Sequence, residues 1–423
     1  MESDKVELKR TTMLKTLYLK NFTVFADARL EFCSGLNVIV GQNGTGKTQL
    51  LKAAYLMNRT WPDLMYKPLA LNKNRAEAYF EKRLQGLFQP VKLDNLIRRG
   101  KADEAQLTAE VEAFIPTLRI TTAAEDQANA AQFAQFPFGS VTESLHWSIS
   151  LKRTQEVSLL NTNAELTASR IPDSAAVNAC VPKSLFIPSK EIVSLYEGLI
   201  ALLDRYEIKL DATYGDLARS MSGPELSSVP ALATGVLGEL EDELGGKLVL
   251  DGGRLSFVAK DGSQTEGPLM AEGFRKLTTL LLLIRRGVIS EKGETLFWDE
   301  PEANLNPAYI RWAANALVAL AHMGIQVIVA THSLFLLREL EILTMDSRFS
   351  SVTRKYFALA GSDEGVVVSA GGDIADIEPL VLLDESLLQS DRYMEANERD
   401  GERGWFSVDY ALADGSRAGA ITR

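Results

Sequence analysis

Residues 41–48 read GQNGTGKT and directly follow GLNVIV, an apolar run at residues 35–40. The octet matches G-x-x-x-x-G-K-[ST] at every fixed position, and TQLLKAAYLMN, at residues 48–58, continues it with apolar residues at helical spacing. This order predicts a strand, a glycine-rich loop and a helix. Glycines let successive backbone N–H groups turn toward phosphate oxygens, and the helix N-terminus adds a partial positive charge. The sequence therefore predicts a nucleotide site at this loop.

The octet also predicts contacts for its polar groups. Lys47 is expected to reach the β- and γ-phosphates, and the Thr48 hydroxyl is expected to bind Mg²⁺. ATP and Mg²⁺ are the ligands that this pattern favours. The residues predicted to surround the phosphates are Gly41, Gln42, Asn43, Gly44, Thr45, Gly46, Lys47 and Thr48.

Two acids end a second apolar run, LFWDEPE, at residues 296–302. Asp299 is expected to lie beside the metal, usually through water, and Glu300 is expected to polarise the attacking water as a general base. Two carboxylates at the end of a strand are often only solvated, but the phosphate loop in the same chain favours the catalytic interpretation. The acid pair thus predicts hydrolysis as well as binding.

A third candidate is His332, which follows the apolar run IQVIVAT at residues 325–331. A histidine just past a buried strand can donate a hydrogen bond to a γ-phosphate. Its position, one helix and one strand after the acid pair, favours a functional role. His146 and His322 have no such context and are expected to be structural or surface residues.

Composition narrows the possible functions. The chain has 423 residues, of which 46% are hydrophobic and 24% charged, as in a globular protein of two or three lobes. A net charge of -11 argues against an extensive basic surface, so DNA would be met only locally. No apolar run approaches the roughly 20 residues of a membrane helix. Two cysteines, Cys33 and Cys180, fit a reducing compartment, so a cytoplasmic protein without a membrane partner is expected.

The order of the elements predicts the fold class. From residue 272 to residue 343 helical periodicity alternates with strand-like runs, which favours a largely parallel sheet covered by helices on both faces. Residues 14–40 contain short strand-like runs, and ESLHWSISLKR is expected to pair with VSLLN. The predicted fold is α/β, with a mixed sheet of parallel core strands and antiparallel N-terminal strands, covered by helices, plus an inserted helical lobe.

Three motifs together carry a resemblance to a known family. GQNGTGKT, FWDEPEANLNP near residue 300 and VIVATHS near residue 330 resemble the ATP-binding-cassette type of ATPase found in the RecF, SMC and overcoming-lysogenisation-defect proteins. The resemblance spans most of residues 14–345. It implies a dimer in which the loop after the acid pair, residues 302–307, crosses the interface. It also implies a signature loop, Ser-Gly-Gly-Gln or a relative, that contacts the γ-phosphate held by the opposite subunit.

By position the signature loop is MAEGFRKL, residues 270–277, and it departs from the family pattern. Gly273 matches well, but Ala271 stands at the serine position and cannot donate the family's hydrogen bond. The Gly273 N–H and the helix start can still present positive potential to a phosphate. Arg275 and Lys276 are further candidates for reaching phosphate. ATP-dependent pairing with slow turnover is therefore expected; the alternative is an ordinary helix N-terminus.

The predicted organisation of the chain has five parts. They are residues 1–60 and 290–370 as the two halves of an ATPase core, 61–136 as a helical insertion, 137–190 as antiparallel strands of the ATPase lobe, 191–289 as a helical and signature lobe, and 371–423 as a C-terminal docking tail.

Four further stretches, KLDNLIRRG, FIPSKEIVSLYEG, AEGFRKL and LLDESLLQSDRYM, are similar to stand-alone ATPases of bacterial antiphage defence, with PARIS-type systems the nearest. This resemblance implies a homo-oligomer with nucleotide at its subunit interfaces, which holds a partner nuclease inactive and releases it on sensing a phage trigger protein. Two other interpretations stay open. One is a RecF-type DNA-repair ATPase that binds DNA in an ATP-dependent way, and the other is a nucleotide-binding module that never hydrolyses.

Overall fold

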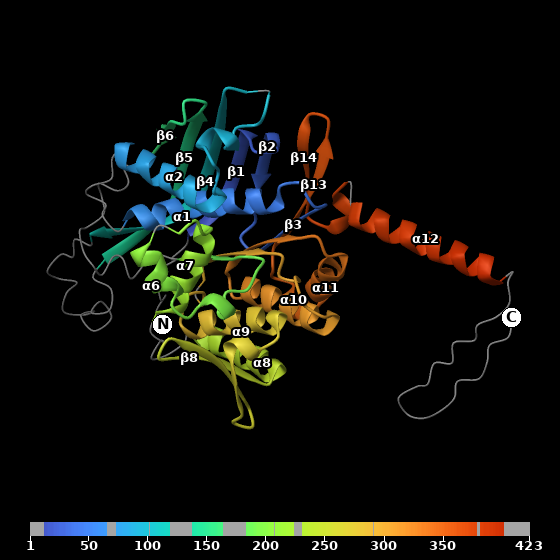
Figure 1. Ribbon diagram of the computed structural model, residues 1–423. Coiled ribbons are helices and arrows are strands. Elements are labelled where there is room, and N and C mark those ends of the chain that lie inside the picture. Colours follow the sequence, from blue (N-terminus) through green and yellow to red (C-terminus); the bar gives the residue numbers. More distant parts are fainter. Residues whose placement is uncertain are drawn as a thin grey trace, which may run out of the picture. The chain divides into compact units, whose positions relative to one another are not determined.

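A computed structural model describes residues 12–65, 73–100, 102–118, 138–163, 183–206, 208–223, 231–290, 292–378 and 381–401. The chain divides into two compact units, Met1–Leu380 and Val381–Arg423. The first unit holds three sheets and the helices that cover them (Figure 1). Among the described helices none is long and apolar enough to cross a membrane.

The sheet that carries the nucleotide-site motifs has six strands in the order β14-β13-β3-β12-β11-β7. All neighbouring pairs are parallel except β13 and β14, which are antiparallel. Every residue of β3, β7, β11 and β12 is buried, as expected for parallel strands covered on both faces. The strands are β3 (Leu36–Gly41), β7 (Ser184–Ile187), β11 (Thr295–Asp299), β12 (Gln326–Thr331), β13 (Arg354–Ser362) and β14 (Gly365–Gly371).

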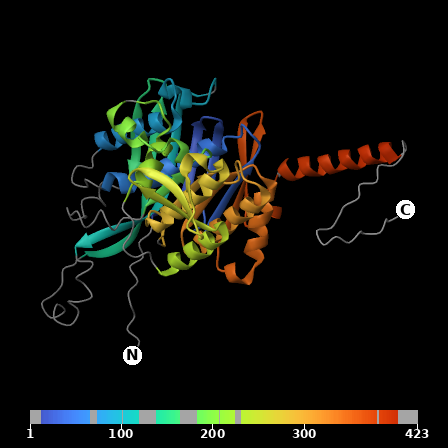
Figure 2. The same ribbon diagram turned by 60° about the horizontal axis from the view of Figure 1, so that its bottom comes forward.

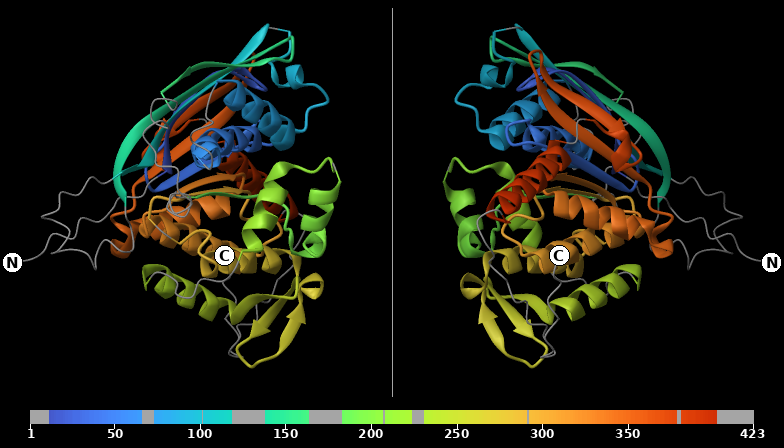
Figure 3. Two further views of the ribbon diagram at one scale, coloured as in Figure 1. Left: turned by 90° about the vertical axis from the view of Figure 1, so that its left-hand side faces the viewer. Right: turned by 90° about the vertical axis from the view of Figure 1, so that its right-hand side faces the viewer.

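Helices cover both faces of this sheet. One face packs against α1 (Lys47–Met65), and the other against α10 (Pro307–His322), with α11 (Leu334–Met345) beside α10 (Figure 3). Because β3, β11 and β12 are parallel, their carboxyl ends meet at one edge, where the glycine-rich loop, the acid pair and His332 follow them. The predicted α/β class with a mixed sheet is confirmed.

A second sheet is antiparallel, in the order β2-β1-β4-β5-β6. Along its strands, buried apolar residues alternate with outward polar ones. The apolar face packs against α1 and α2 (Lys73–Phe88). The strands are β1 (Thr12–Phe22), β2 (Phe25–Glu31), β4 (Glu104–Leu118), β5 (Phe138–Lys152) and β6 (Val157–Thr162). The predicted pairing of ESLHWSISLKR with VSLLN is the β5–β6 pair.

Two predicted segments need correction. Residues 61–136 are not a purely helical insertion, because β4 pairs with β5 over its whole length and places Ala105, Leu107 and Ala109 in the core. Alanine, glutamate and glutamine hide this period of two, because they are typical of helices. Residues 119–137 lie outside the described residues. Residues 137–190 are not all antiparallel, since β7 joins the parallel sheet beside β11.

A fully buried glutamine ties the two large sheets together. Gln326, at the start of β12, donates from Nε2 to the carbonyls of Leu14 at 2.8 Å and Cys33 at 2.9 Å. Its Oε1 accepts from the Leu14 N–H at 2.8 Å. These bonds satisfy backbone groups where β1 passes over the parallel sheet, so Gln326 fixes the spacing between the layers.

The segment between β7 and β11 forms a lobe of helices with a small sheet, β10-β9-β8. Figure 2 shows this sheet, in yellow, beside α8 and α9. The lobe contains α6 (Leu199–Arg205), α7 (Ala212–Met221), α8 (Ala231–Leu244), β8 (Gly246–Asp251), β9 (Arg254–Ala259), β10 (Gln264–Glu266) and α9 (Glu272–Arg285). The β8–β9 hairpin turns at Gly252 and Gly253, both of which have a positive φ.

The second unit is described only as α12 (Val381–Gly401). Large apolar side chains on it, among them Leu387 and Met394, are more than half exposed. The boundary falls at residue 381, so residues 371–378 belong to the first unit and not to the predicted tail. Residues 402–423 lie outside the described residues, and the docking role of this segment stays a prediction.

Candidate nucleotide site

The glycine-rich loop leaves β3 and enters α1 with a backbone conformation that favours glycine at two points. Gly44 and Gly46 both have φ of 84°, in the left-handed region. A Cβ on Gly46 would lie 2.5 Å from Cγ2 of Val24, so there is also no room for a side chain. The residues Gln42 to Gly44 are exposed. The loop therefore offers its backbone N–H groups at the start of α1, where the helix dipole favours an anion.

The Lys47 side chain is buried against this loop. Its Nζ donates to the carbonyls of Gly41 at 2.8 Å and Gln42 at 2.9 Å. Burial lowers the pKa of Lys47, while the nearby carboxylates, Glu300 first, act in the opposite direction. The ammonium is thus held against the loop by two neutral carbonyl acceptors, which negatively charged phosphate oxygens can replace with stronger bonds.

Thr48 and Asp299 meet, although 251 residues separate them. Thr48 Oγ1 donates to Asp299 Oδ2 at 2.9 Å, and the other carboxylate oxygen, Oδ1, is buried without a hydrogen-bond partner. Burial raises the pKa of Asp299 to about 6, whereas the Thr48 bond lowers it. A hydroxyl and a carboxylate are the hard oxygen donors that Mg²⁺ prefers, and the partnerless oxygen fits a cation or its water. These two residues therefore suit the predicted metal.

No group of three or more His, Cys, Asp or Glu side chains suited to hold a metal occurs within the described part of the chain. A magnesium ion at Thr48 and Asp299 would need phosphate oxygens and water for its other ligands, as is usual for this ion. The metal and the nucleotide would thus bind together.

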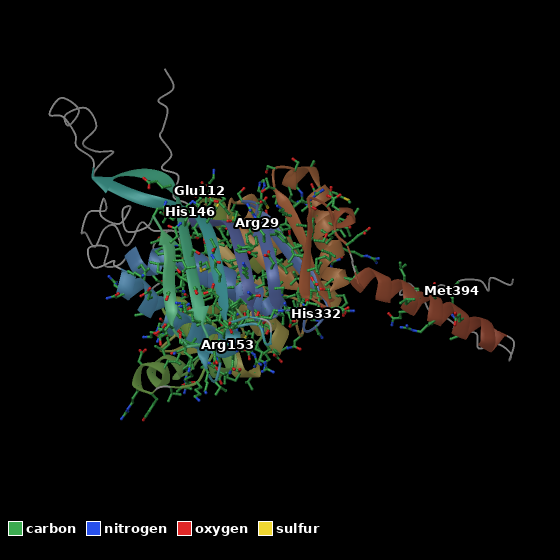
Figure 4. The ribbon with its side chains drawn as sticks, turned by 90° about the horizontal axis from the view of Figure 1, so that it is seen from above. Arg29, Glu112, His146, Arg153, His332 and Met394 are labelled. Atoms are coloured by element: carbon green, nitrogen blue, oxygen red, sulfur yellow. The ribbon has the colours of Figure 1, made fainter. Side chains whose placement is uncertain are left out.

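Glu300 and His332 lie side by side at the same edge. Glu300 Oε1 is 3.2 Å from His332 Nδ1, and both side chains are partly exposed. Figure 4 labels His332, which Glu300 neighbours. Glu300 has a φ of +46°, which is strained for a residue other than glycine. Backbone strain of this kind clusters at functional sites.

Glu302 holds the backbone before His332, a role that sequence reasoning missed. Its Oε1 accepts from Thr331 Oγ1 at 2.6 Å and from the His332 N–H at 3.1 Å, while its Oε2 is buried without a hydrogen-bond partner. The sequence had placed Glu302 only in the interface loop. The available signal for this role was that Glu302 is a third acid just after the acid pair. Glu302 is therefore a positioning residue for the histidine.

Within one chain, the signature-loop residues pack against the loop that follows the acid pair. Ala271 precedes α9 and makes no side-chain capping bond. A Cβ on Gly273 would lie 2.4 Å from the carbonyl oxygen of Asn304, so the glycine packs against the loop that follows the acid pair. The Glu272 carboxylate accepts from Asn304 Nδ2 at 2.8 Å. A contact between Gly273 and a nucleotide stays a prediction.

Arg275 and Lys276 are engaged inside their own chain, which corrects their candidacy as phosphate ligands. Arg275 pairs with Glu191 at 3.0 Å and donates to the Pro268 carbonyl at 3.1 Å. Lys276 is 2% exposed and donates to two backbone carbonyls. The apolar run that follows them gave no sign that Lys276 is buried as well.

The two other histidines lie apart from this cluster. His146 is exposed on β5, as Figure 4 shows, and His322 ends α10 against the Phe349 ring, 5.6 Å between centroids. Their predicted structural or surface character agrees with these positions.

Charged side chains fasten α1, the helix behind the phosphate loop, to α7. Lys52 pairs with Asp211, the N-cap of α7, and donates to the Leu87 carbonyl at 3.0 Å. Further along, Asp216 accepts from Tyr55 Oη at 2.9 Å and from Arg83 at 2.7 Å. No sequence pattern predicts this network, because its members lie far apart in the chain.

Asp216→Asn is expected to lower the free energy of unfolding by about 3 kcal/mol, because it leaves the largely buried side chain of Arg83 without its counter-charge. Urea denaturation measures this. The matched control is Asp204→Asn, whose exposed carboxylate pairs with Arg219 at 2.9 Å and is expected to matter by less than about 1 kcal/mol. Equal losses in the two variants would show that the network adds nothing to stability.

Two segments of the chain match described protein families. Residues 229–338 match the family described as "AAA domain, putative AbiEii toxin, Type IV TA system", and residues 16–174 match a family described as "AAA domain". The first match takes in α9, the acid pair and His332, and the second takes in the glycine-rich loop.

Relatives match over short stretches. The DNA replication and repair protein RecF of Pediococcus pentosaceus is 51% identical over 47 residues, 11% of this chain and 13% of that protein. The DNA double-strand break repair Rad50 ATPase of Archaeoglobus fulgidus is 46% identical over 41 residues, 10% of this chain and 5% of that protein. The chain thus spans only about an eighth of the RecF protein it matches.

Solved structures with a similar arrangement include SMC head domains. That of Thermotoga maritima shares 15% identity at a TM-score of 0.44, covering 84% of this chain and 98% of that one. That of Pyrococcus yayanosii shares 12% identity at a TM-score of 0.47, covering 89% of this chain and 100% of that one. Two segments of the chain thus match AAA-type ATPase domains, and shorter segments are similar to a RecF protein and to a Rad50 ATPase.

Proposed function

We propose that this chain is an ATP-binding and slowly hydrolysing molecular switch. The observation that carries the proposal is the meeting of the Thr48–Asp299 bond and the Glu300–His332 pair at one sheet edge, next to the buried Lys47. These groups come from three separate parts of the sequence. Together they supply what phosphoryl transfer to water needs: phosphate binding, a metal ligand set, a general base and a hydrogen-bond donor.

Each group has a distinct task in hydrolysis. The loop N–H groups and Lys47 bind the phosphates, with the Lys47 Nζ exchanging its two carbonyl acceptors for phosphate oxygens. The Glu300 carboxylate accepts a proton from the attacking water, and His332 donates toward the γ-phosphate. Mg²⁺, when bound at Thr48 and Asp299, offsets charge on the phosphate oxygens.

Slow turnover is the expected behaviour because of Ala271. In the proposed dimer, the start of α9 faces the nucleotide of the second copy, and Ala271 supplies no hydroxyl there. The N–H groups around Gly273 still offer positive potential. Such a site favours a long-lived ATP-bound assembly over rapid cycling.

The biological setting that we propose is antiphage defence, in which the chain holds a partner nuclease inactive and releases it on sensing a phage trigger protein. The match of residues 229–338 to a family described by a putative toxin and a toxin–antitoxin system supports this setting. The exposed apolar side chains of α12 are the candidate contact for the partner.

The test is to purify the chain with the proteins encoded beside it and to assay nuclease activity with and without ATP and Mg²⁺. The expected result is a co-purifying nuclease that is silent in the complex and active when released. A chain that hydrolyses ATP but retains no neighbouring protein would contradict the defence role and leave the ATPase assignment intact. A chain that never turns over ATP would instead be a binding module.

A RecF-like DNA-repair ATPase is the second candidate, favoured by the sequence similarity to RecF. The outer face of the five-stranded sheet is a poor surface for DNA, because acidic side chains lie among its basic side chains. Arg29 and Glu112 on this face are labelled in Figure 4, and both take part in ion pairs, with Glu31 and Lys15 respectively. DNA binding that is stimulated by ATP and falls steeply with salt would favour this candidate. No binding at low salt would remove it.

A further inference from the structure

The first two turns of α9 contact the acid pair and the loop after it at three points of the same chain. Glu272 bonds Asn304 at 2.8 Å, and Gly273 packs against the Asn304 carbonyl. One turn later, Lys276 Nζ donates to the carbonyl of Glu300 and, at 2.9 Å, to that of Ser189. Helical spacing places residues 272, 273 and 276 on one side of the helix, so they act on the loop together.

Lys276 is unusual because a lysine is rarely buried so completely. Its charge lies among Asp299, Glu300, Glu302 and Glu272. If Lys276 served only as a counter-ion, its Nζ would form a salt bridge with one of these carboxylates. The Lys276 Nζ instead bonds backbone carbonyls on two turns, one after β7 and one after β11. Lys276 therefore fixes the path of the backbone and also balances the charge of the neighbouring carboxylates.

The carbonyl that Lys276 holds belongs to the strained residue. Glu300 adopts a φ of +46°, a conformation that costs on the order of 1 kcal/mol outside glycine. The Ala303 N–H also donates to the Glu300 carbonyl, at 3.1 Å, and closes a tight turn. Since the peptide direction sets where the side chain points, holding this carbonyl keeps the Glu300 carboxylate next to His332.

We propose that Lys276 is a positioning residue that couples the start of α9 to the orientation of the Glu300 carboxylate. The inference rests on the proposed ATP hydrolysis and deepens it. Movement of α9 is passed through Lys276 to the general base of the same subunit. A nucleotide that engages the start of α9 from a second copy thereby controls hydrolysis at this subunit's own site, without touching that site.

The test compares Lys276→Met with Arg286→Met in the full-length protein. Arg286 is a buried cation at the other end of the same helix, where it also donates to a backbone carbonyl, that of Gly223. Lys276→Met is expected to lower kcat about 100-fold, since a displacement of about 1 Å at a catalytic group has that effect, with the Kd for ATP changed less than about threefold. Arg286→Met is expected to lower the unfolding midpoint while it keeps kcat near that of the wild type.

A double variant separates positioning from general loosening. In a Glu300→Gln background the base is already lost, so adding Lys276→Met is expected to lower the rate no further. A full additional loss there would mean that Lys276 acts elsewhere. A wild-type kcat in Lys276→Met, or an equal kcat loss in Arg286→Met, would overturn the proposal even if the wild type hydrolyses ATP. No hydrolysis by the wild type would instead refute the proposed function itself.

A second variant keeps the proposal testable if Lys276→Met does not fold. Asn304→Gly removes the exposed bond to Glu272, and glycine suits the φ of +63° at this position. It is expected to fold like the wild type and to lower kcat about fivefold with unchanged Kd for ATP, because one of the three grips is lost. Unchanged kcat in this variant would show that the grip on the loop has no bearing on catalysis.

Discussion

Glu300→Gln is expected to lower kcat for ATP hydrolysis by about 10²–10⁴-fold and to leave ATP binding intact. Glutamine has nearly the same shape as glutamate but cannot take a proton from water. The side chain contributes no bond to the phosphate loop or to Asp299, so the affinity for ATP has no reason to fall. With hydrolysis blocked, the ATP-bound assembly is expected to accumulate.

Single-turnover kinetics and size-exclusion chromatography with ATP measure the two effects. The control is Glu239→Gln, an exposed acid on α8 remote from the site, which is expected to behave like the wild type. If Glu300→Gln hydrolyses ATP at the wild-type rate, another group is the base and the role given to the acid pair is wrong.

Asp299→Asn is expected to have two opposite effects: a more stable protein without Mg²⁺, and loss of Mg²⁺-dependent ATP binding. Burial raises the pKa of Asp299 from 3.8 to about 6. A raised pKa contributes stability that is present below pH 4 and is lost as the pH rises through 6. At pH 7.5 the buried charge therefore costs roughly 2–3 kcal/mol, which the neutral amide avoids.

Urea unfolding at pH 5 and pH 7.5, without Mg²⁺, tests the first effect. The gain in stability of Asp299→Asn over the wild type is expected to be larger at pH 7.5 than at pH 5, because the wild-type carboxyl is mostly protonated at the lower pH. Equal or lower stability of the variant at pH 7.5 would show that burying the Asp299 carboxylate carries no such cost. Retained Mg²⁺ dependence of ATP binding would contradict the metal role.

Much of the site was predictable because three motifs lie at the carboxyl ends of apolar strands. In a parallel sheet those ends meet, so GQNGTGKT, Asp299 and His332 had to converge once the strands were read correctly. The roles follow from residue chemistry. The distances between Thr48 and Asp299 and between Glu300 and His332 required the structure.

The remainder was hidden for physical reasons. β4 alternates alanine with acids and glutamine, which is a helical composition with a strand period. The sequence made Lys276 a candidate for reaching phosphate and Glu302 part of the interface loop, and only the packing of α9 and of the loop after β11 shows that both are buried. The Asp216 network joins three helices across more than 150 residues, beyond any local pattern.

Isothermal titration calorimetry of ATP with Mg²⁺, on the wild type and on Lys47→Ala, tests most directly that the glycine-rich loop holds ATP. The wild type is expected to bind, and the variant to lose at least about 100-fold in affinity, because it lacks the ammonium that reaches the phosphates. Equal affinity of the two proteins would contradict a phosphate-binding role for the loop and the ATPase function built on it.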